Sequence, residues 1–253
     1  MKKTIILVHG LRGTHHGLKA VASNLAYAGY KTILPDLPGS GTRPQLDNKS
    51  LQGYTEWLHL YIQGLNLSDK PIILGHSMGS IVVSHYLEKY PDDVANKVIF
   101  MSPIFRDKTA QKGNEVLYSI FNGSAHLLPK KARYNFLKSK AVSYCISHYL
   151  TIDKSQQKEI DELHYKYSGR FASADSLLAD MKISMRQQTV VPPHKDILMI
   201  IGEKDRLAAS KTVKQIADEH HAHLVQIKNT GHLINYEQPG QVSDAILEFL
   251  RHN

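Results

Sequence analysis

One serine of this chain lies in a setting that could make its hydroxyl a nucleophile. Ser77 is the centre of a Gly-His-Ser-Met-Gly segment at 75–79, with an apolar run before it and a helical pattern after it. Strand, tight turn and helix is the context in which a G-x-S-x-G motif lifts a serine hydroxyl off the sheet. Strand and helix atoms crowd the positions two before and two after such a serine, and both are glycine here. Without this flanking pattern, the motif would indicate only a glycine-rich turn with an incidental serine.

A base and an acid for this serine follow it in the chain. A serine hydroxyl is a weak nucleophile, so hydrolysis needs a base within hydrogen-bond reach and a third group that orients the base. Asp205 ends a Gly-Glu-Lys-Asp segment and His232 ends a Thr-Gly-His segment, each just after a predicted strand. Both side chains are therefore expected at the same sheet edge as Ser77. Asp107, which follows another predicted strand, is an alternative acid.

Short apolar runs alternate with helical patterns on both sides of a long middle segment. Strands are expected at 4–8, 31–35, 71–74, 97–101, 196–201 and 223–227, and helices at 16–28, 54–65, 81–90, 210–221 and 242–250. The strand runs are apolar without alternation, as in strands that helices cover on both faces. This order favours right-handed βαβ units. We therefore predict an α/β fold with a doubly wound, mainly parallel six-stranded sheet.

The alternation stops between residues 105 and 193, where helices of mixed polarity are expected and an insertion is inferred. Residues 106–193 hold 14 of the 31 Lys and Arg residues and 8 of the 23 Asp and Glu residues, so they carry +6 of the net charge of +8. This basic segment indicates either a solvated helical face or attraction of an anionic substrate or an acidic carrier protein. No nucleic-acid-binding module is recognisable, so nucleic acid is not an expected partner.

The composition excludes several classes of site. The single cysteine, Cys145, excludes an intrachain disulfide and a cysteine-based zinc site, and it fits a reducing, cytoplasmic location. The histidines at 220, 221 and 223 lack a carboxylate or cysteine at fitting spacing, so no metal and no cofactor are expected.

No apolar stretch approaches the roughly 20 residues of a membrane span. The apolar run at 5–8 is interpreted as a buried strand, not as a signal sequence. No pattern predicts the oligomeric state.

The chain resembles the α/β-hydrolase superfamily. Its His-Gly turn at 9–10, its serine motif and its Gly-x-x-Asp and Gly-His segments come in the family order. The resemblance covers a core at 1–104 and 194–253, and the insertion at 105–193 occupies the position of the family's helical cap, or lid. Many relatives have two antiparallel strands before the His-Gly strand. This chain begins directly at that strand, which is similar to the compact esterase and hydroxynitrile-lyase-like branch.

The resemblance implies a catalytic arrangement. His232 would take the proton of Ser77 as the hydroxyl attacks an acyl carbon, and Asp205 would orient the imidazole and stabilise its cation. The backbone N–H groups of Leu11 and Met78 would form the oxyanion hole. Losing one such donor typically costs about 3 kcal/mol of transition-state stabilisation.

Several functions fit this arrangement. A serine nucleophile argues against the dehalogenases and epoxide hydrolases of the superfamily, which use an aspartate. The leading hypothesis is a carboxylesterase-type hydrolase that acts on small or medium acyl esters through an acyl-enzyme. Hydrolysis of a carbon-carbon or an amide bond is the first alternative, and a receptor-like protein that binds its ligand without turnover is the second.

Substrate contacts are predicted in two places. Arg12 lies beside the proposed oxyanion hole, where it would contact an anionic group or remain solvated. Aromatic residues of the proposed cap are candidates for an acyl pocket, although aromatic residues at helical spacing more often form a core. These candidates are Tyr118, Phe121, Tyr134, Phe136, Tyr144 and Tyr149.

Overall fold

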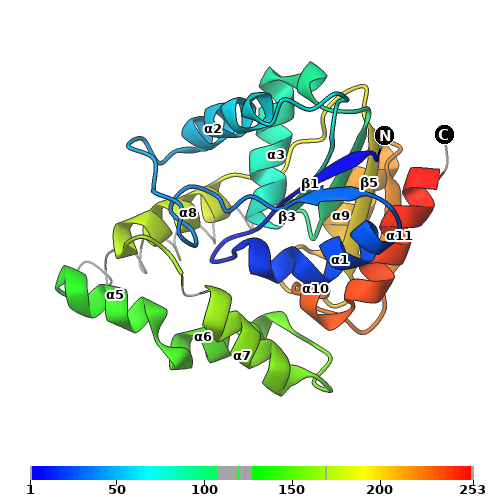
Figure 1. Ribbon diagram of the computed structural model, residues 1–253. Helices are drawn as coiled ribbons and strands as arrows, with labels where there is room; N and C mark the ends of the chain where they lie inside the picture. The colour runs from blue at the N-terminus through cyan, green and yellow to red at the C-terminus, as the bar shows by residue number, and fades with distance from the viewer. Residues whose placement is uncertain (1, 107–118, 120–122, 124–126, 169, 252–253) are drawn as a thin grey trace.

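The computed structural model describes residues 2–106, 119, 123, 127–168 and 170–251 (Figure 1). Within these residues, six strands form one sheet in the order β2-β1-β3-β4-β5-β6, and every neighbouring pair is parallel. The strands are β1 (Thr4–Val8), β2 (Lys31–Ile33), β3 (Ile72–His76), β4 (Lys97–Met101), β5 (Asp196–Gly202) and β6 (His223–Ile227). The predicted α/β fold with a parallel six-stranded sheet is confirmed.

Helices cover both faces of the sheet, which explains the continuous apolar runs. Along β1, Ile6 and Val8 belong to one core cluster and Ile5 and Leu7 to the other, and all four are 0% exposed. On the first face lie α2 (Leu51–Gly64), α3 (Met78–Lys89) and α9 (Ser210–Glu219). On the second face lie η1 (His15–Leu18), α1 (Lys19–Tyr27), α10 (Ile234–Glu237) and α11 (Pro239–Arg251) (Figure 1).

The strand order reverses between β1 and β3. From β1 the chain passes to β2 on one side, and the next strand, β3, pairs with β1 on the other side. At such a reversal, the loops beyond the carboxyl ends of the two strands diverge and leave a crevice in which ligands bind. The His-Gly turn follows β1 and Ser77 follows β3, so the sheet places both at this crevice.

Some boundaries differ from those predicted, for local reasons. The helix predicted from 54 begins at Leu51, because the Ser50 side chain accepts a hydrogen bond from the backbone N of Gly53 and caps the helix. The last helix begins at Pro239 rather than at 242, with the proline at its first position, where the missing N–H has no helical partner to lose. A short 3-10 helix, η2 (Pro91–Asp93), and α10 were not predicted.

The described part of 105–193 is helical, and it packs on the core. It forms α5 (Lys130–Lys138), α6 (Lys140–Leu150), α7 (Gln157–Ser168) and α8 (Ala174–Arg186). Leu137, Phe171 and Leu177 make a small apolar cluster, against which Leu11 of the core packs. The division of the chain into a core and a separate cap domain stays a prediction. Among the described residues, none of the helices combines the length and the apolar character needed to cross a membrane.

A buried ion pair joins α8 to the core. Lys49 Nζ lies 2.9 Å from Asp180 Oδ2, and their side chains are 8% and 4% exposed. The hydroxyl of Tyr54, which is itself buried in α2, donates to the other carboxylate oxygen at 2.7 Å. Removal of either partner leaves a buried charge without compensation, so the stability of the folded protein depends strongly on both residues.

We expect Lys49→Met to lower the free energy of unfolding by about 3 kcal/mol, since Asp180 would then be buried without its cation. Chemical denaturation at neutral pH measures this change. Lys130→Met is the matched control, because Lys130 is 87% exposed and lies 4.0 Å from its partner Asp175. Equal stability of the two variants would contradict the assignment of the pair as a buried interaction.

Candidate active site

Ser77 occupies a strained turn between β3 and α3. Its backbone has φ 54° and ψ −119°, a conformation that residues with side chains rarely adopt. A Cβ atom at Gly75 would lie 2.6 Å from the carbonyl oxygen of Gly79, and one at Gly79 would lie 2.4 Å from that of Val8. These contacts are the physical reason for glycine at both positions. The backbone N of Ser77 donates to the carbonyl of Met101 at 3.0 Å, which fixes the turn against β4.

The structure brings Ser77, His232 and Asp205 into one chain of hydrogen bonds. Ser77 Oγ and His232 Nε2 are 2.8 Å apart, and His232 Nδ1 and Asp205 Oδ2 are also 2.8 Å apart. The residues are 9%, 2% and 8% exposed. Since the carboxylate can only accept, the network assigns the proton to Nδ1 and leaves the lone pair of Nε2 facing the serine hydroxyl. This tautomer can take the serine proton during an attack.

Asp205 is held by backbone donors as well as by His232. Its Oδ1 accepts hydrogen bonds from the backbone N of Leu207 at 2.8 Å and of Ala208 at 2.9 Å. Burial works to raise the pKa of the Asp205 carboxyl, but the attraction of His232 and these hydrogen bonds outweigh it and leave the pKa below its ordinary value. The group is therefore an anion at neutral pH. Asp107, the alternative acid, lies outside the described residues.

The backbone of His232 is bonded on both sides. Its N–H donates to the carbonyl of Leu150, at the end of α6, at 2.8 Å. Its carbonyl accepts from Ser102 Oγ at 3.1 Å and lies 3.4 Å from His76 Nε2. Burial, together with His232, lowers the pKa of His76 to about 3, so His76 is neutral and can donate from one ring nitrogen. This position makes His76 a hydrogen-bonding residue beside the base.

The loops that carry the acid and the base touch through two glycines. A Cβ atom at Gly202, at the end of β5, would lie 2.1 Å from the carbonyl oxygen of Gly231. A Cβ atom at Gly231 would lie 2.2 Å from the carbonyl oxygen of Leu150. Backbone therefore packs directly on backbone at both places. The contact between Gly202 and Gly231 sets the separation between the loops of the acid and the base.

The turn after β1 lies against the nucleophile. A Cβ atom at Gly10 would lie 2.9 Å from Ser77 Cβ and 3.0 Å from the carbonyl oxygen of His76. His9 holds this turn, because its Nδ1 lies 2.9 Å from the carbonyl of Gly10 and its Nε2 accepts a 2.9 Å hydrogen bond from the backbone N of Leu37. Burial lowers the pKa of His9, which keeps the ring in the neutral form that these contacts require.

This packing places the backbones of Leu11 and Met78 beside Ser77. Leu11 follows Gly10, and Met78 is the first residue of α3. The first N–H groups of a helix have no acceptor within the helix and are available to a negatively charged oxygen. The oxyanion hole formed by the N–H groups of Leu11 and Met78 stays a prediction.

Arg12 is buried and not solvated. It is 8% exposed, its φ is 58°, and burial lowers its pKa to about 10. One guanidinium nitrogen donates to the carbonyl of Leu137 at 3.0 Å and another to Ser143 Oγ at 3.3 Å, and the group lies 5.6 Å from the centre of the Phe171 ring. Arg12 thus links the turn after β1 to α5 and α6. Its predicted contact with a substrate is untested.

The candidate aromatic residues lie in different surroundings. Tyr118 and Phe121 fall outside the described residues. Phe136 is 55% exposed and Tyr149 is 52% exposed, and the Tyr149 ring lies 5.3 Å from the guanidinium of Arg206. Both of these side chains therefore face solvent over about half of their surface.

Tyr134 and Tyr144 have partners within the inserted helices. Tyr134 meets the ring of Phe171 edge-on at 5.4 Å, and its hydroxyl donates to the Phe171 carbonyl at 3.3 Å. The hydroxyl of Tyr144 donates to Glu162. Packing within the helices accounts for both rings, and a role of any of these aromatic residues toward a substrate stays a prediction.

Sequence reasoning missed the residues that hold His232 from outside the motif. Ser102 contacts the His232 carbonyl and Leu150 contacts its N–H, while the carboxylate of Glu237 accepts from the neighbouring backbone N of Gly231 at 2.8 Å. No sequence pattern indicates these contacts, because the positive φ of Ser102 is visible only in the structure. Over the part of the chain that is described, no group of three or more His, Cys, Asp or Glu side chains is placed to hold a metal ion.

We expect Gly10→Ala to lower kcat of the activity proposed below by on the order of a hundredfold, because the added methyl displaces Ser77 from His232. Gly64→Ala is the matched control, since a Cβ atom at Gly64 meets nothing within 4 Å. Steady-state kinetics of the two variants measures the effect. Wild-type kinetics in a folded Gly10→Ala protein would contradict the tight contact at this turn.

Two buried histidines predict a loss of stability in acid. The folded-state pKa is about 3 for His76 and about 4 for His164, the latter lowered by burial and by Arg12, while an unfolded histidine has a pKa of about 6.5. Below pH 6.5 the unfolded state therefore binds more protons, and the free energy of unfolding falls. Each histidine contributes a slope that approaches about 1.4 kcal/mol per pH unit. Urea unfolding at pH 7, 6 and 5 should show a smaller slope for His164→Gln than for the wild type, and equal slopes would contradict the assignment.

Comparison with known proteins gives the family. A family model described as "alpha/beta hydrolase fold" matches residues 3–239. Phospholipase YtpA of Bacillus subtilis is 29% identical over a match that spans 39% of each chain, and Lipase 1 of Psychrobacter immobilis is 22% identical over 97% of this chain and 76% of its own.

Solved structures share the fold at low identity. An esterase from Thermogutta terrifontis has a TM-score of 0.77 and 20% identity over 99% of this chain and 90% of its own. A bromoperoxidase from Bacillus anthracis has a TM-score of 0.80 and 18% identity over 99% of this chain and 92% of its own. With the family model spanning both the sheet and the Ser77 turn, this chain belongs to the α/β-hydrolase fold family.

Proposed function

We propose that the chain is a carboxylic ester hydrolase that acts through an acyl-enzyme on Ser77. The observation that carries this proposal is the buried chain of hydrogen bonds from Ser77 through His232 to Asp205, with 2.8 Å at each step. A hydroxyl bonded to a neutral imidazole, which is in turn bonded to an anionic carboxylate, is the arrangement that acyl transfer uses. Relatives named as esterase and lipase support the choice of an ester bond.

The reaction follows from these contacts. Ser77 Oγ attacks the acyl carbon while its proton passes to His232 Nε2, and the anionic Asp205 stabilises the imidazolium that forms. The N–H groups of Leu11 and Met78 stabilise the negative oxygen of the tetrahedral intermediate. The intermediate then expels the alcohol, which takes the proton from His232.

Water completes the cycle. The acyl-enzyme is attacked by a water molecule that His232 deprotonates, and collapse of the second tetrahedral intermediate returns the proton to Ser77 and releases the acid. Ser77 is only 9% exposed, and Leu11 packs against Leu137 and Phe171 of the inserted segment. This enclosure favours acyl groups of small or medium size.

The test is hydrolysis of p-nitrophenyl esters from acetate to decanoate. We expect an optimum at a short or medium chain length, and a loss of kcat of about 10⁴-fold or more in Ser77→Ala, Asp205→Asn and His232→Ala. The first change removes the nucleophile, the second removes the anion that holds the imidazole and stabilises its cation, and the third removes the base. His223→Ala is the control for the histidine change, since the side chain of His223 is 62% exposed and far from this path in the fold.

Other outcomes would redirect the proposal. Stoichiometric labelling of Ser77 by a fluorophosphonate without ester turnover would indicate an active nucleophile for a carbon-carbon or amide bond. A ligand retained without turnover, together with no labelling, would favour a receptor-like protein. Activity that survives Ser77→Ala would contradict the acyl-enzyme.

A further inference from the structure

A buried carboxylate connects the loop of His232 to the inserted helices. Glu237 in α10 is 4% exposed, and its Oε1 accepts from the backbone N of Gly231 at 2.8 Å. Its Oε2 accepts from the backbone N of Ile152 at 2.8 Å and of Asp153 at 2.9 Å, just beyond the end of α6. A carboxylate has only acceptor oxygens, and these contacts are all with donors. Glu237 therefore bridges two segments that are far apart in the sequence.

The bridged segments also meet directly. The backbone N of His232 donates to the carbonyl of Leu150 at 2.8 Å, and a Cβ atom at Gly231 would lie 2.2 Å from that same carbonyl oxygen. The last carbonyls of a helix have no partner within the helix, so this bond satisfies an acceptor that α6 leaves open. The position of His232 is thus set partly by the end of α6.

The loops of the other site residues contact α6 or the helix before it. Arg206 follows Asp205, and its guanidinium donates to the carbonyl of Tyr149 at 2.9 Å. Arg12 follows Leu11, and it donates to the carbonyl of Leu137 and to Ser143 Oγ. The inserted helices therefore contact each of the loops that carry the acid, the base and the first oxyanion donor.

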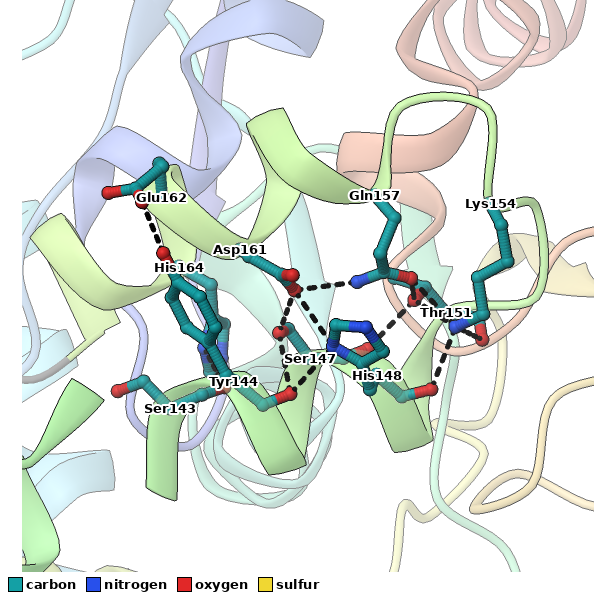
Figure 2. A network of polar contacts seen from close by, with 10 residues as sticks. All are labelled: Ser143, Tyr144, Ser147, His148, Thr151, Lys154, Gln157, Asp161, Glu162 and His164. Carbon is teal, nitrogen blue, oxygen red and sulfur yellow. Dashed lines mark hydrogen bonds and ion pairs between the residues drawn. The ribbon is translucent and has the colours of Figure 1, made fainter. Parts of the chain in front are cut away.

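The end of α6 is itself held by a buried polar network, which Figure 2 shows. Asp161 of α7 is 5% exposed, and its Oδ1 accepts from Ser147 Oγ at 2.5 Å and from Gln157 Nε2 at 2.6 Å. Thr151 is 0% exposed, and its hydroxyl lies 2.5 Å from Gln157 Oε1. Ile152 and Asp153 come directly after Thr151 in the sequence. Glu237 therefore binds a segment whose first residues are already held in place by this network.

We propose that Glu237 is a positioning residue for His232, which holds the loop of the catalytic base against the end of α6. The inference rests on the catalytic role proposed above for His232. Without the carboxylate, the Gly231 peptide would lose its acceptor and Nε2 would no longer be held at 2.8 Å from Ser77. Such a displacement impairs proton transfer more than substrate binding.

The first test is Glu237→Gln, which keeps the shape of the side chain and replaces one acceptor oxygen with a donor. We expect kcat for a p-nitrophenyl ester to fall by on the order of tenfold, with KM changed by less than about twofold, and the rate of fluorophosphonate labelling of Ser77 to fall in parallel. Glu248→Gln, on the exposed side of α11, is the control and should match the wild type. A folded Glu237→Gln protein with wild-type kcat and labelling rate would overturn the proposal, even if its Tm were lower.

The second test uses the unchanged protein and does not depend on activity. Ile152 and Asp153 belong to no helix or strand, so no helical or sheet hydrogen bond protects their amides. Their hydrogen bonds to Glu237 should therefore be what slows hydrogen exchange at these two amides. We expect exchange slower by on the order of a hundredfold than at the exposed residues Asp47 and Asn48. If Glu237→Gln fails to fold, this measurement decides, and exchange as fast as at Asp47 would overturn the proposal.

The two proposals can fail separately. If the wild type labels with the fluorophosphonate but hydrolyses no ester, the proposed function fails, and the labelling rates of Glu237→Gln and Glu248→Gln still test the positioning role. If the wild type neither hydrolyses an ester nor labels, both proposals are overturned.

Discussion

Ser77 adopts a positive φ, and close contacts between backbones keep it there. Gly75 and Gly79 let the strand and the helix approach each other, and Gly10 lets the turn after β1 approach the serine. A backbone conformation of this kind costs of order 1–3 kcal/mol and persists only where the surrounding structure determines it. Here the surroundings are the centre of the sheet, which is fully buried on both faces. Packing in the core therefore fixes the direction of the Ser77 side chain before a substrate binds.

The base opposite this serine depends on a different kind of interaction. His232 comes from a loop beyond β6, at the edge of the sheet, and its place is set by polar contacts to Asp205, Ser102, Leu150 and its neighbours. Buried networks of this type are stable only when each member has a partner. His76 meets that condition, because its ring donates to the His232 carbonyl. Since the ring is neutral, it adds no second positive charge beside the base. The nucleophile is thus positioned by packing and the base by hydrogen bonds.

The sequence was most informative where burial leaves a pattern. The strands at 4–8 and 97–101 were predicted with the bounds that the structure has, and Ser77, Asp205 and His232 meet because each follows a parallel strand at the same edge. The contacts of Glu237 and Arg12 could not be predicted in the same way. Each involves a side chain and the backbone of a distant segment, and every residue offers such a backbone group. Only the folded arrangement selects the partner.

The strand order has a consequence for how the protein forms during synthesis. β1 is made first, yet it lies inside the sheet between β2 and β3, and its contacts with β3 join residues near 5 to residues near 72. Ser77 and His232 are 155 residues apart, so the base reaches the nucleophile only after β6 has emerged and paired. Pairings between distant segments form slowly, because the intervening chain must first be ordered. A ribosome-bound chain would therefore carry Ser77 well before it carries a partner that could activate it, and reactivity would arise only in the finished molecule.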